Sequence, residues 1–249
     1  MISKFLPLGI FVSTVLGAVT GHAQDYSLLR LEGRPVRWQQ APENARAVLE
    51  LSYAFLREPA TVPGARNCKS MIAIDATTET LGVSFPRFQQ EVDAAFHIWA
   101  RVLDIRFRKS GDPARADILI GSQATPRGIA FADVRVDTSQ PGEFATISGA
   151  SICLNPNASW AMERDGSAET FTLRYVIAHE IGHTLGLDHP GRTGQLMAFA
   201  YQEDMTDLTE GDIAGIAGIY GTPSTRIAMQ PSATDNPKED SQYPPDSTA

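Results

Sequence analysis

Eleven consecutive residues constrain the fold of this chain more than any other feature. Residues 179–189 read His-Glu-Ile-Gly-His-Thr-Leu-Gly-Leu-Asp-His and hold three of the five histidines in the 249-residue sequence. Two histidines four residues apart, His179 and His183, project from one face of a helix and can bind the same ion. Gly186 tolerates the left-handed conformation in which many helices end, so the chain can turn back and bring His189 to the same point. The window therefore predicts a helix, a turn and a metal site with three nitrogen ligands.

The number of ligands indicates which metal binds and what it does. Three protein ligands with one open position are typical of a catalytic zinc, whereas a structural zinc is closed by a fourth protein ligand. Glu180 follows the first histidine and can approach a metal-bound water without being a ligand itself. The full spacing arises by chance in on the order of 10⁻⁵ chains of this length, so a helix with solvent-facing histidines is the weaker interpretation. We expect one Zn²⁺ on His179, His183 and His189, with Glu180 as the catalytic residue.

Residues 1–23 predict a secretory signal peptide. Lys4 precedes an apolar run over residues 5–19, and small residues at Gly21 and Ala23 occupy the two positions that a signal peptidase reads. A transmembrane anchor is the alternative, but Pro, Gly, Ser and Thr interrupt the run, which is shorter than the roughly 20 apolar residues of a span. No later stretch is apolar enough to cross a membrane. We therefore expect cleavage after Ala23 and a secreted protein, extracellular or, in a Gram-negative host, periplasmic.

Composition bounds the rest of the chain. The formal net charge is −8, and nucleic-acid binding requires clustered Lys and Arg for phosphate contacts, so no nucleic-acid partner is expected. Residues 222–249 are rich in Pro, Ser, Thr and Asp with little to bury, which predicts a disordered tail. The remaining residues, 24–221, predict one domain whose core covers about residues 47–221.

The periodicity of this region predicts an α+β fold with a mixed sheet. Residues 57–84 are interpreted as a long connection that carries Cys68. Strands are expected mostly before helices, which favours α+β over alternating units. The expected strands cover residues 48–56, 105–107, 116–121, 128–134 and 150–154. Three helices are expected: the first begins at Pro86, the second covers residues 168–185 and the third covers residues 209–220.

On these motifs the sequence resembles the metzincin clan of zinc endopeptidases, and within it the matrixins, over roughly residues 48–221. Gln195-Leu196-Met197 is similar to the Met-turn, in which a methionine forms an apolar floor beneath the zinc histidines. Tyr201 follows four residues later, where the resemblance places a wall of the specificity pocket. Residues 208–221 are similar to the C-terminal helix of the family. The resemblance implies a twisted mixed sheet with an active-site helix and a C-terminal helix.

The same resemblance implies a secreted zinc-dependent endopeptidase. Glu180 would assist the attack of a zinc-bound water on a peptide bond, and an extended protein or peptide substrate would lie along residues 128–134. A monomer is expected. The alternative is a non-enzymatic secreted zinc-binding module of the same fold, whose usual sign would be loss of the glutamate that is retained here.

Several positions depart from the family pattern. Outside the signal peptide and the motif only His97 remains, so a second, structural zinc cannot be built from imidazoles. Gly211 stands where the family usually has the first of two acids, while Asp212, the second, is retained and is expected to brace the Met-turn. Phe199 and Ala200 occupy the stretch that holds a proline in the family. The loss of the first acid at Gly211 and the mismatch between the residues around Cys68 and the family's PRCGxPD segment favour activation without removal of a pro-domain.

The two cysteines and one acidic loop leave alternatives open. We favour a disulfide between Cys68 and Cys153, because a secreted protein folds in an oxidising compartment. A cysteine switch, in which the Cys68 thiol reaches the zinc, and two free thiols are the alternatives. Ca²⁺ is a further candidate at Asp133, Asp137 and Glu143, but their spacing matches no known loop and a solvated acidic loop is the stronger interpretation.

Overall fold

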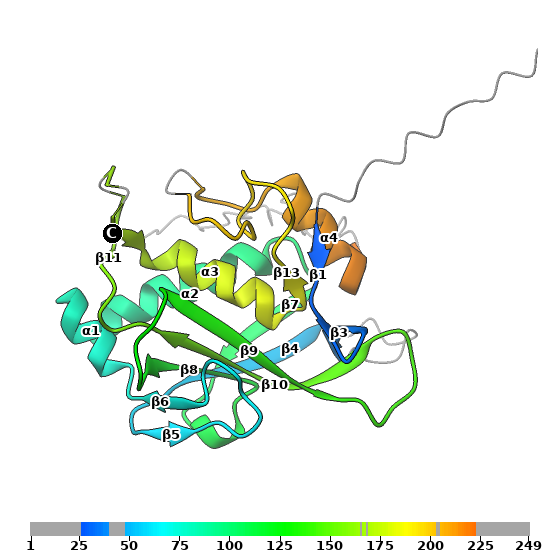
Figure 1. Cartoon of the computed structure of the whole chain (residues 1–249), viewed down its shortest axis with the longest axis horizontal. Coiled ribbons are helices and arrows are strands. Elements are labelled where there is room, and N and C mark those ends of the chain that lie inside the picture. Colours follow the sequence, from blue (N-terminus) through cyan, green and yellow to red (C-terminus); the bar gives the residue numbers. More distant parts are fainter. Residues whose placement is uncertain (1–25, 40–47, 165, 168, 203–204, 223–249) are drawn as a thin grey trace, which may run out of the picture.

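Two helices, α2 (Phe85–Ala100) and α3 (Leu173–Thr184), lie side by side over one face of a twisted β-sheet (Figure 1). This computed structural model describes residues 26–39, 48–164, 166–167, 169–202 and 205–222. The predicted signal peptide and residues 223–249 of the predicted tail lie outside these ranges. The α+β architecture expected from the sequence is confirmed.

The sheet is mixed, as predicted. Four parallel strands run in the order β7-β4-β8-β10, and β9 pairs antiparallel with the outer side of β10 from Thr146↔Asp137 to Leu154↔Ala130. Among the described strands β9 pairs only with β10, so its other edge has no strand beside it. The bounds are β4 (Leu49–Phe55), β7 (Ile105–Lys109), β8 (Ile118–Gln123), β9 (Ala130–Asp137) and β10 (Ala145–Leu154).

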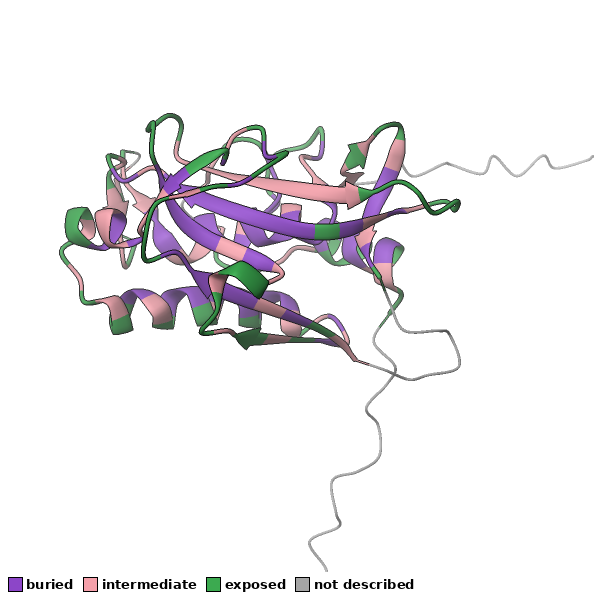
Figure 2. Cartoon of the chain, turned by 90° about the horizontal axis from the view of Figure 1, so that it is seen from below, coloured by how far each residue is buried: buried purple, intermediate pink, exposed green. Residues whose placement is uncertain are grey.

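Strand β10 is buried along almost its whole length, whereas β9 is only half-buried (Figure 2). Helix α3 packs on one face of the two strands, and the loop around Cys68 packs on the other. A strand that is covered on both faces is apolar at successive positions rather than at alternating ones. The predicted strand, residues 150–154, covers the continuously buried part of β10 and misses its first five residues.

Helix α2 begins where the sequence predicts. The Ser84 side chain accepts a hydrogen bond from the Arg87 N–H at 3.4 Å, and Pro86 lies in the first turn, where its missing N–H is not needed. Near its C-terminus, Trp99 Nε1 donates to the carbonyl oxygen of Ala178 at 2.8 Å. A buried indole thus links α2 to α3 just before the first motif histidine.

The core extends to residues before position 47. Strands β2 (Arg30–Leu31) and β3 (Arg34–Trp38) form a hairpin that turns at Glu32 and Gly33, both with positive φ, and β3 then pairs parallel with residues 145–147 of β10. Its side chains Val36 and Trp38 are buried. The preceding strand, β1 (Ser27–Leu28), pairs antiparallel with β13 (Leu187–Asp188) inside the motif.

Residues 57–84 are more structured than the predicted connection. They contain β5 (Ala60–Thr61), β6 (Ser70–Ile72) and α1 (Asp75–Leu81), and β6 pairs antiparallel with β8. Strands of two or three residues are too short to show a period, which is why they escaped prediction. The remaining elements are a 3₁₀ turn (Pro113–Arg115), β11 (Trp160–Ala161), β12 (Phe171–Thr172) and α4 (Glu210–Tyr220).

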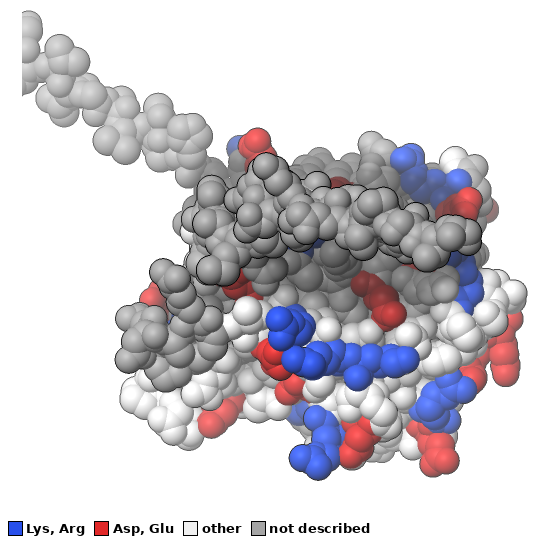
Figure 3. All heavy atoms as spheres, turned by 180° about the vertical axis from the view of Figure 1, so that it is seen from behind, with Lys and Arg blue, Asp and Glu red and all other residues white. Residues whose placement is uncertain are grey.

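The surface does not gather one sign of charge on the face seen in Figure 3, where Lys and Arg alternate with Asp and Glu. On the edge strand β7, for example, Arg106 and Arg108 both pair with Glu50. Within the described residues no helix has the length and apolarity that a membrane span requires.

Candidate metal centre

The three motif histidines converge as predicted. The Nε2 atoms of His179 and His183 lie 3.1 Å apart, and Nε2 of His189 lies 3.1 Å from the first and 3.2 Å from the second. Zinc–nitrogen bonds of about 2.0–2.1 Å in a tetrahedral site separate the nitrogens by roughly 3.3 Å, so the triangle fits one Zn²⁺. Among the described residues this is the single group of three or more His, Cys, Asp or Glu that could hold a metal ion.

Backbone carbonyls orient two of the imidazoles. His179 Nδ1 lies 2.7 Å from the Leu196 oxygen, and His183 Nδ1 lies 2.9 Å from the Leu187 oxygen. Because a carbonyl only accepts, each Nδ1 carries the proton and each Nε2 offers its lone pair to the metal. Burial lowers the pKa of His179 to about 4 and that of His183 well below its usual value, which keeps both rings neutral as ligands must be.

The turn after α3 requires the glycine that the sequence singled out. Gly186 has φ of 102°, and a Cβ there would lie far inside van der Waals contact with the Val36 carbonyl oxygen. The N-terminal segment therefore lies against this turn, and the Leu29 N–H donates to the Gly186 oxygen at 2.8 Å. Trp38 Nε1 donates to the Thr184 oxygen at 2.8 Å. Residues before the predicted core thus hold the turn that carries His189.

The Met-turn lies beneath the histidines. Met197 is buried, and its side chain packs against Gly182, where an added Cβ would also lie 2.8 Å from Trp99 Cζ2. Asp212 is 1% exposed; its carboxylate accepts from the N–H groups of Leu196 at 3.0 Å and Met197 at 3.1 Å. The bracing contact expected for Asp212 is therefore present.

Position 211 shows what replaces the first acid of the family pattern. A Cβ on Gly211 would already lie 2.7 Å from Cδ of Gln195, whose side chain is buried beside the helix. A glutamine from the Met-turn thus fills the space that a longer side chain at position 211 would need.

Glu180 lies inside the cavity that the histidines open into. Its side chain is 6% exposed, and burial raises the pKa of its carboxyl to about 8, with the Asp133 charge adding to the rise and a hydrogen bond from the Ala132 backbone opposing it. The cavity has a volume of about 470 Å³ and is bounded by α3, the start of β9 and the chain after Gln195. A basic carboxylate therefore stands next to three neutral nitrogens at the wall of one cavity.

Two aromatic residues bound the cavity on the Met-turn side. Tyr201 accepts a hydrogen bond from the Thr172 N–H at 2.9 Å and packs edge-on against Phe171. Phe199, which stands where the family has a proline, is 83% exposed, and its ring centroid lies 5.1 Å from that of His189. Both residues line the cavity, and a part for Tyr201 in a specificity pocket stays a prediction.

The remaining candidates lie outside the metal centre. His97 is exposed on α2 and does not belong to the histidine group. Asp133 accepts hydrogen bonds from the backbone, and Asp137 accepts one from the Ser139 N–H. These two acids and Glu143 form no metal-holding group among the described residues, and calcium binding stays a prediction.

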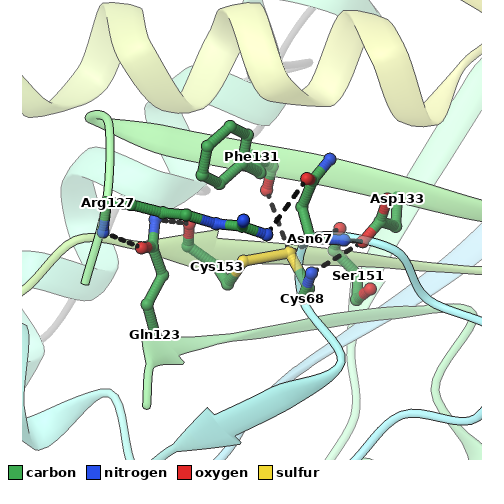
Figure 4. The surroundings of a disulfide bond; sticks show 8 residues. All are labelled: Asn67, Cys68, Gln123, Arg127, Phe131, Asp133, Ser151 and Cys153. Carbon is green, nitrogen blue, oxygen red and sulfur yellow. Dashed lines mark hydrogen bonds between the residues drawn. A yellow bond between two sulfur atoms is a disulfide. The ribbon is translucent and has the colours of Figure 1, made fainter. Parts of the chain in front are cut away.

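Cys68 and Cys153 form a disulfide, with a Cα–Cα distance of 5.6 Å (Figure 4). The favoured pairing is confirmed, and neither cysteine is a free thiol that could reach the metal. Cys153 lies on β10 opposite Phe131 of β9, so the disulfide attaches the loop before β6 to the sheet directly below the cavity.

Sequence reasoning missed several residues of the site, among them Leu29 and Asn67, which line the cavity, and Trp38, which holds the turn. Apolar and polar residues alternate on both sides of the Glu-Gly pair at 32–33, and this pattern indicates the hairpin of β2 and β3. No local signal indicates that this hairpin packs against a turn so distant in sequence.

Comparison with known proteins agrees with this geometry. Residues 68–221 match the family described as Matrixin. The chain is 31% identical over 140 residues to metalloendoproteinase 1-MMP of Arabidopsis thaliana (54% of this chain, 38% of that protein). It is 29% identical over 141 residues to matrilysin of Mus musculus (55% of this chain, 52% of that protein). It is also 28% identical over 157 residues to interstitial collagenase A of Mus musculus (60% of this chain, 32% of that protein).

The match to these three relatives thus spans between about a third and a half of their length. The family match covers more than half of this chain and contains the three histidines, Glu180, Met197 and Asp212. The chain belongs to the matrixin family of zinc endopeptidases.

Proposed function

We propose that this protein is a secreted zinc-dependent endopeptidase. The observation that carries the proposal is the triangle of three Nε2 atoms, spaced for one Zn²⁺, beside the buried carboxyl of Glu180 in a cavity of about 470 Å³. Zinc held by three histidines keeps one position open, which suits catalysis rather than a purely structural role.

Each residue then has a defined task. Bound zinc would lower the pKa of a water molecule and polarise the substrate carbonyl as a Lewis acid. Glu180 would accept the proton of the attacking water and deliver it to the leaving nitrogen. Met197 and Asp212 would hold the histidines in place from below, since they contact α3 and the Met-turn and do not face the reacting atoms.

The edge of β9 that faces away from β10 is unpaired among the described strands, which supports a peptide substrate. An extended peptide can add to an unpaired strand edge through main-chain hydrogen bonds, and residues 128–132 of this segment line the cavity that contains Glu180. The substrate would therefore lie along β9 with its scissile bond beside the metal.

Secretion is supported by the predicted signal peptide and by the disulfide, which persists in oxidising compartments. A single domain covering residues 24–221, acting as a monomer, is part of the same proposal. It includes the N-terminal segment that pairs with the metal-binding turn.

The test compares wild type with Glu180→Gln, using casein or gelatin with and without a chelator. The variant should keep its zinc and lose nearly all turnover, while His183→Ala should lose the zinc itself. Glu143→Gln, which changes an exposed carboxylate, is the matched control and should behave as wild type. Full activity of Glu180→Gln would exclude this mechanism, and a wild type that holds zinc but cleaves no protein or peptide would favour the non-enzymatic binding module.

A further inference from the structure

One polar side chain at the cavity wall has no role in the metal centre. Asn67 is half-buried and lines the same cavity as His179 and Glu180, although it comes from the loop before β6. Figure 4 shows its amide rising past β9 toward the side on which α3 lies. It therefore lies beside β9, the strand along which a peptide would bind, and lines the same cavity as residues 128–132.

The backbone of this loop is fixed from two sides. The N–H groups of Asn67 and Cys68 both donate to Asp133 Oδ2, each at 2.7 Å, and Cys68 is covalently bound to Cys153 of the sheet. Loops that carry binding residues are commonly mobile. Here a disulfide and a part-buried carboxylate–backbone contact hold Asn67 in one place relative to β9.

The amide itself is also oriented. Arg127 Nη2 donates to Asn67 Oδ1 at 3.3 Å, and the Arg127 guanidinium lies over the Phe131 ring at 5.4 Å from its centroid. The Arg127 N–H in turn donates to Gln123 Oε1 at 2.7 Å, which holds its backbone in place. Because the carbonyl end of the amide faces Arg127, its NH₂ end is turned away and available as a donor.

We propose that Asn67 binds substrate, donating a hydrogen bond from its Nδ2 to the main chain of a peptide that lies along β9. Binding sites are largely apolar and use a few well-placed polar groups to set the orientation of the ligand. Asn67 fits that description and lies one residue before the segment that matches the matrixin family. Its contribution depends on the disulfide, so reduction of Cys68–Cys153 would weaken peptide binding without touching the metal ligands.

The test uses the zinc-loaded full protein and an extended peptide that it cleaves. Asn67→Ala should raise KM, and lower kcat/KM by roughly two- to tenfold, with kcat unchanged, as expected for one lost neutral hydrogen bond. Asn67→Asp should have a similar or larger effect, because it keeps the size and the Arg127 contact but has no N–H to donate. Arg66→Ala, an exposed neighbour on the same loop, is the matched control and should leave KM unchanged.

The dependence on the disulfide is tested in the same assay. The double substitution Cys68→Ser, Cys153→Ser should raise KM when it is made in the wild-type protein. Made in the Asn67→Ala variant, it should cause little further rise in KM. An unchanged or lowered KM in Asn67→Ala overturns the proposal, and a lowered value would identify the side chain as an obstruction. The inference rests on the proposed function, so a wild type that cleaves nothing would refute that function. If the wild type is active and Asn67→Ala has the same KM as wild type, only this inference is refuted.

Discussion

Asp212 and His179 are joined through one residue, since Leu196 donates its N–H to the Asp212 carboxylate at 3.0 Å and its carbonyl oxygen accepts from His179 Nδ1 at 2.7 Å. The same carboxylate accepts from Met197 and from the N–H and hydroxyl of Thr209. A helix-capping acid on α4 therefore sets the orientation of a metal ligand on α3. The position of the Met-turn is the link between them.

Asp212→Asn should destabilise the protein by about 1.5–3 kcal/mol, because hydrogen bonds to a buried charged group are worth that much and the amide nitrogen would face donors. Urea unfolding of the metal-free protein measures this loss. Glu210→Gln, an exposed acid in the same turn, is the control. Equal stability of the two variants would contradict a bracing role.

Gly182→Ala should cost about 1–3 kcal/mol through overpacking, because its Cβ would meet the Met197 side chain and lie 2.8 Å from Trp99 Cζ2. Gly191→Ala is the matched control, since an added Cβ there meets nothing within 4 Å. Denaturant unfolding of both variants tests the close approach. A neutral Gly182→Ala would show that the Met-turn can move away from α3 freely.

Trp38→Phe should lower stability by about 1–3 kcal/mol, because it keeps an aromatic ring but leaves the buried Thr184 carbonyl oxygen without its indole donor. Arg30→Lys on the exposed part of the same hairpin should stay within about 0.5 kcal/mol of wild type. The measurement is the same unfolding titration. If both variants match wild type, the hairpin does not hold the metal-binding turn.

His189→Ala should abolish binding of stoichiometric zinc, whereas His97→Ala should retain it, because only the first removes a corner of the nitrogen triangle. Elemental analysis after dialysis measures the difference. In thermal unfolding, zinc at about 1,000 times its Kd should stabilise wild type by about 4 kcal/mol, and a chelator should remove that gain. A zinc-dependent shift of the same size in His189→Ala would place the metal elsewhere.

Reduction of the disulfide should lower the free energy of unfolding by about 2–4 kcal/mol, because Cys68 and Cys153 close a loop with a sequence separation of 85 residues. Paired unfolding titrations with and without a reductant measure the effect. The Cys68→Ser, Cys153→Ser double variant should not respond to the reductant. A response of that variant would show that the reductant acts elsewhere, for example on the zinc.

Local spacing predicted the metal centre because its parts are close in sequence. His179 and His183 share one helix face, and the turn at Gly186 determines where His189 returns. The contacts that support the centre join distant segments: Trp38 reaches Thr184 across 146 residues, and Asn67 reaches Asp133 across 66. Periodicity indicates which face of an element is buried but not which element covers it.

The same argument applies to the fold. Helix α3 begins five residues later, and β10 five residues earlier, than predicted. The elements α2 and β4 were predicted within one or two residues, because a period needs several repeats to show. Strands β5 and β6 were not, since each is only a few residues long and exists because it pairs with a neighbour. The main elements of the domain can therefore be predicted from sequence periodicity, whereas its shortest strands depend on tertiary pairing and cannot.

The pairing of the first strand with the metal-binding turn also affects the order of folding. Contacts between distant residues form slowly, because the entropy of closing the intervening loop is lost before the contact stabilises anything. The bond from Trp38 to Thr184 cannot form until almost the whole domain has been synthesised. A partly made chain therefore has no braced turn, and the complete metal centre forms only after the N-terminal hairpin has packed against the metal-binding turn.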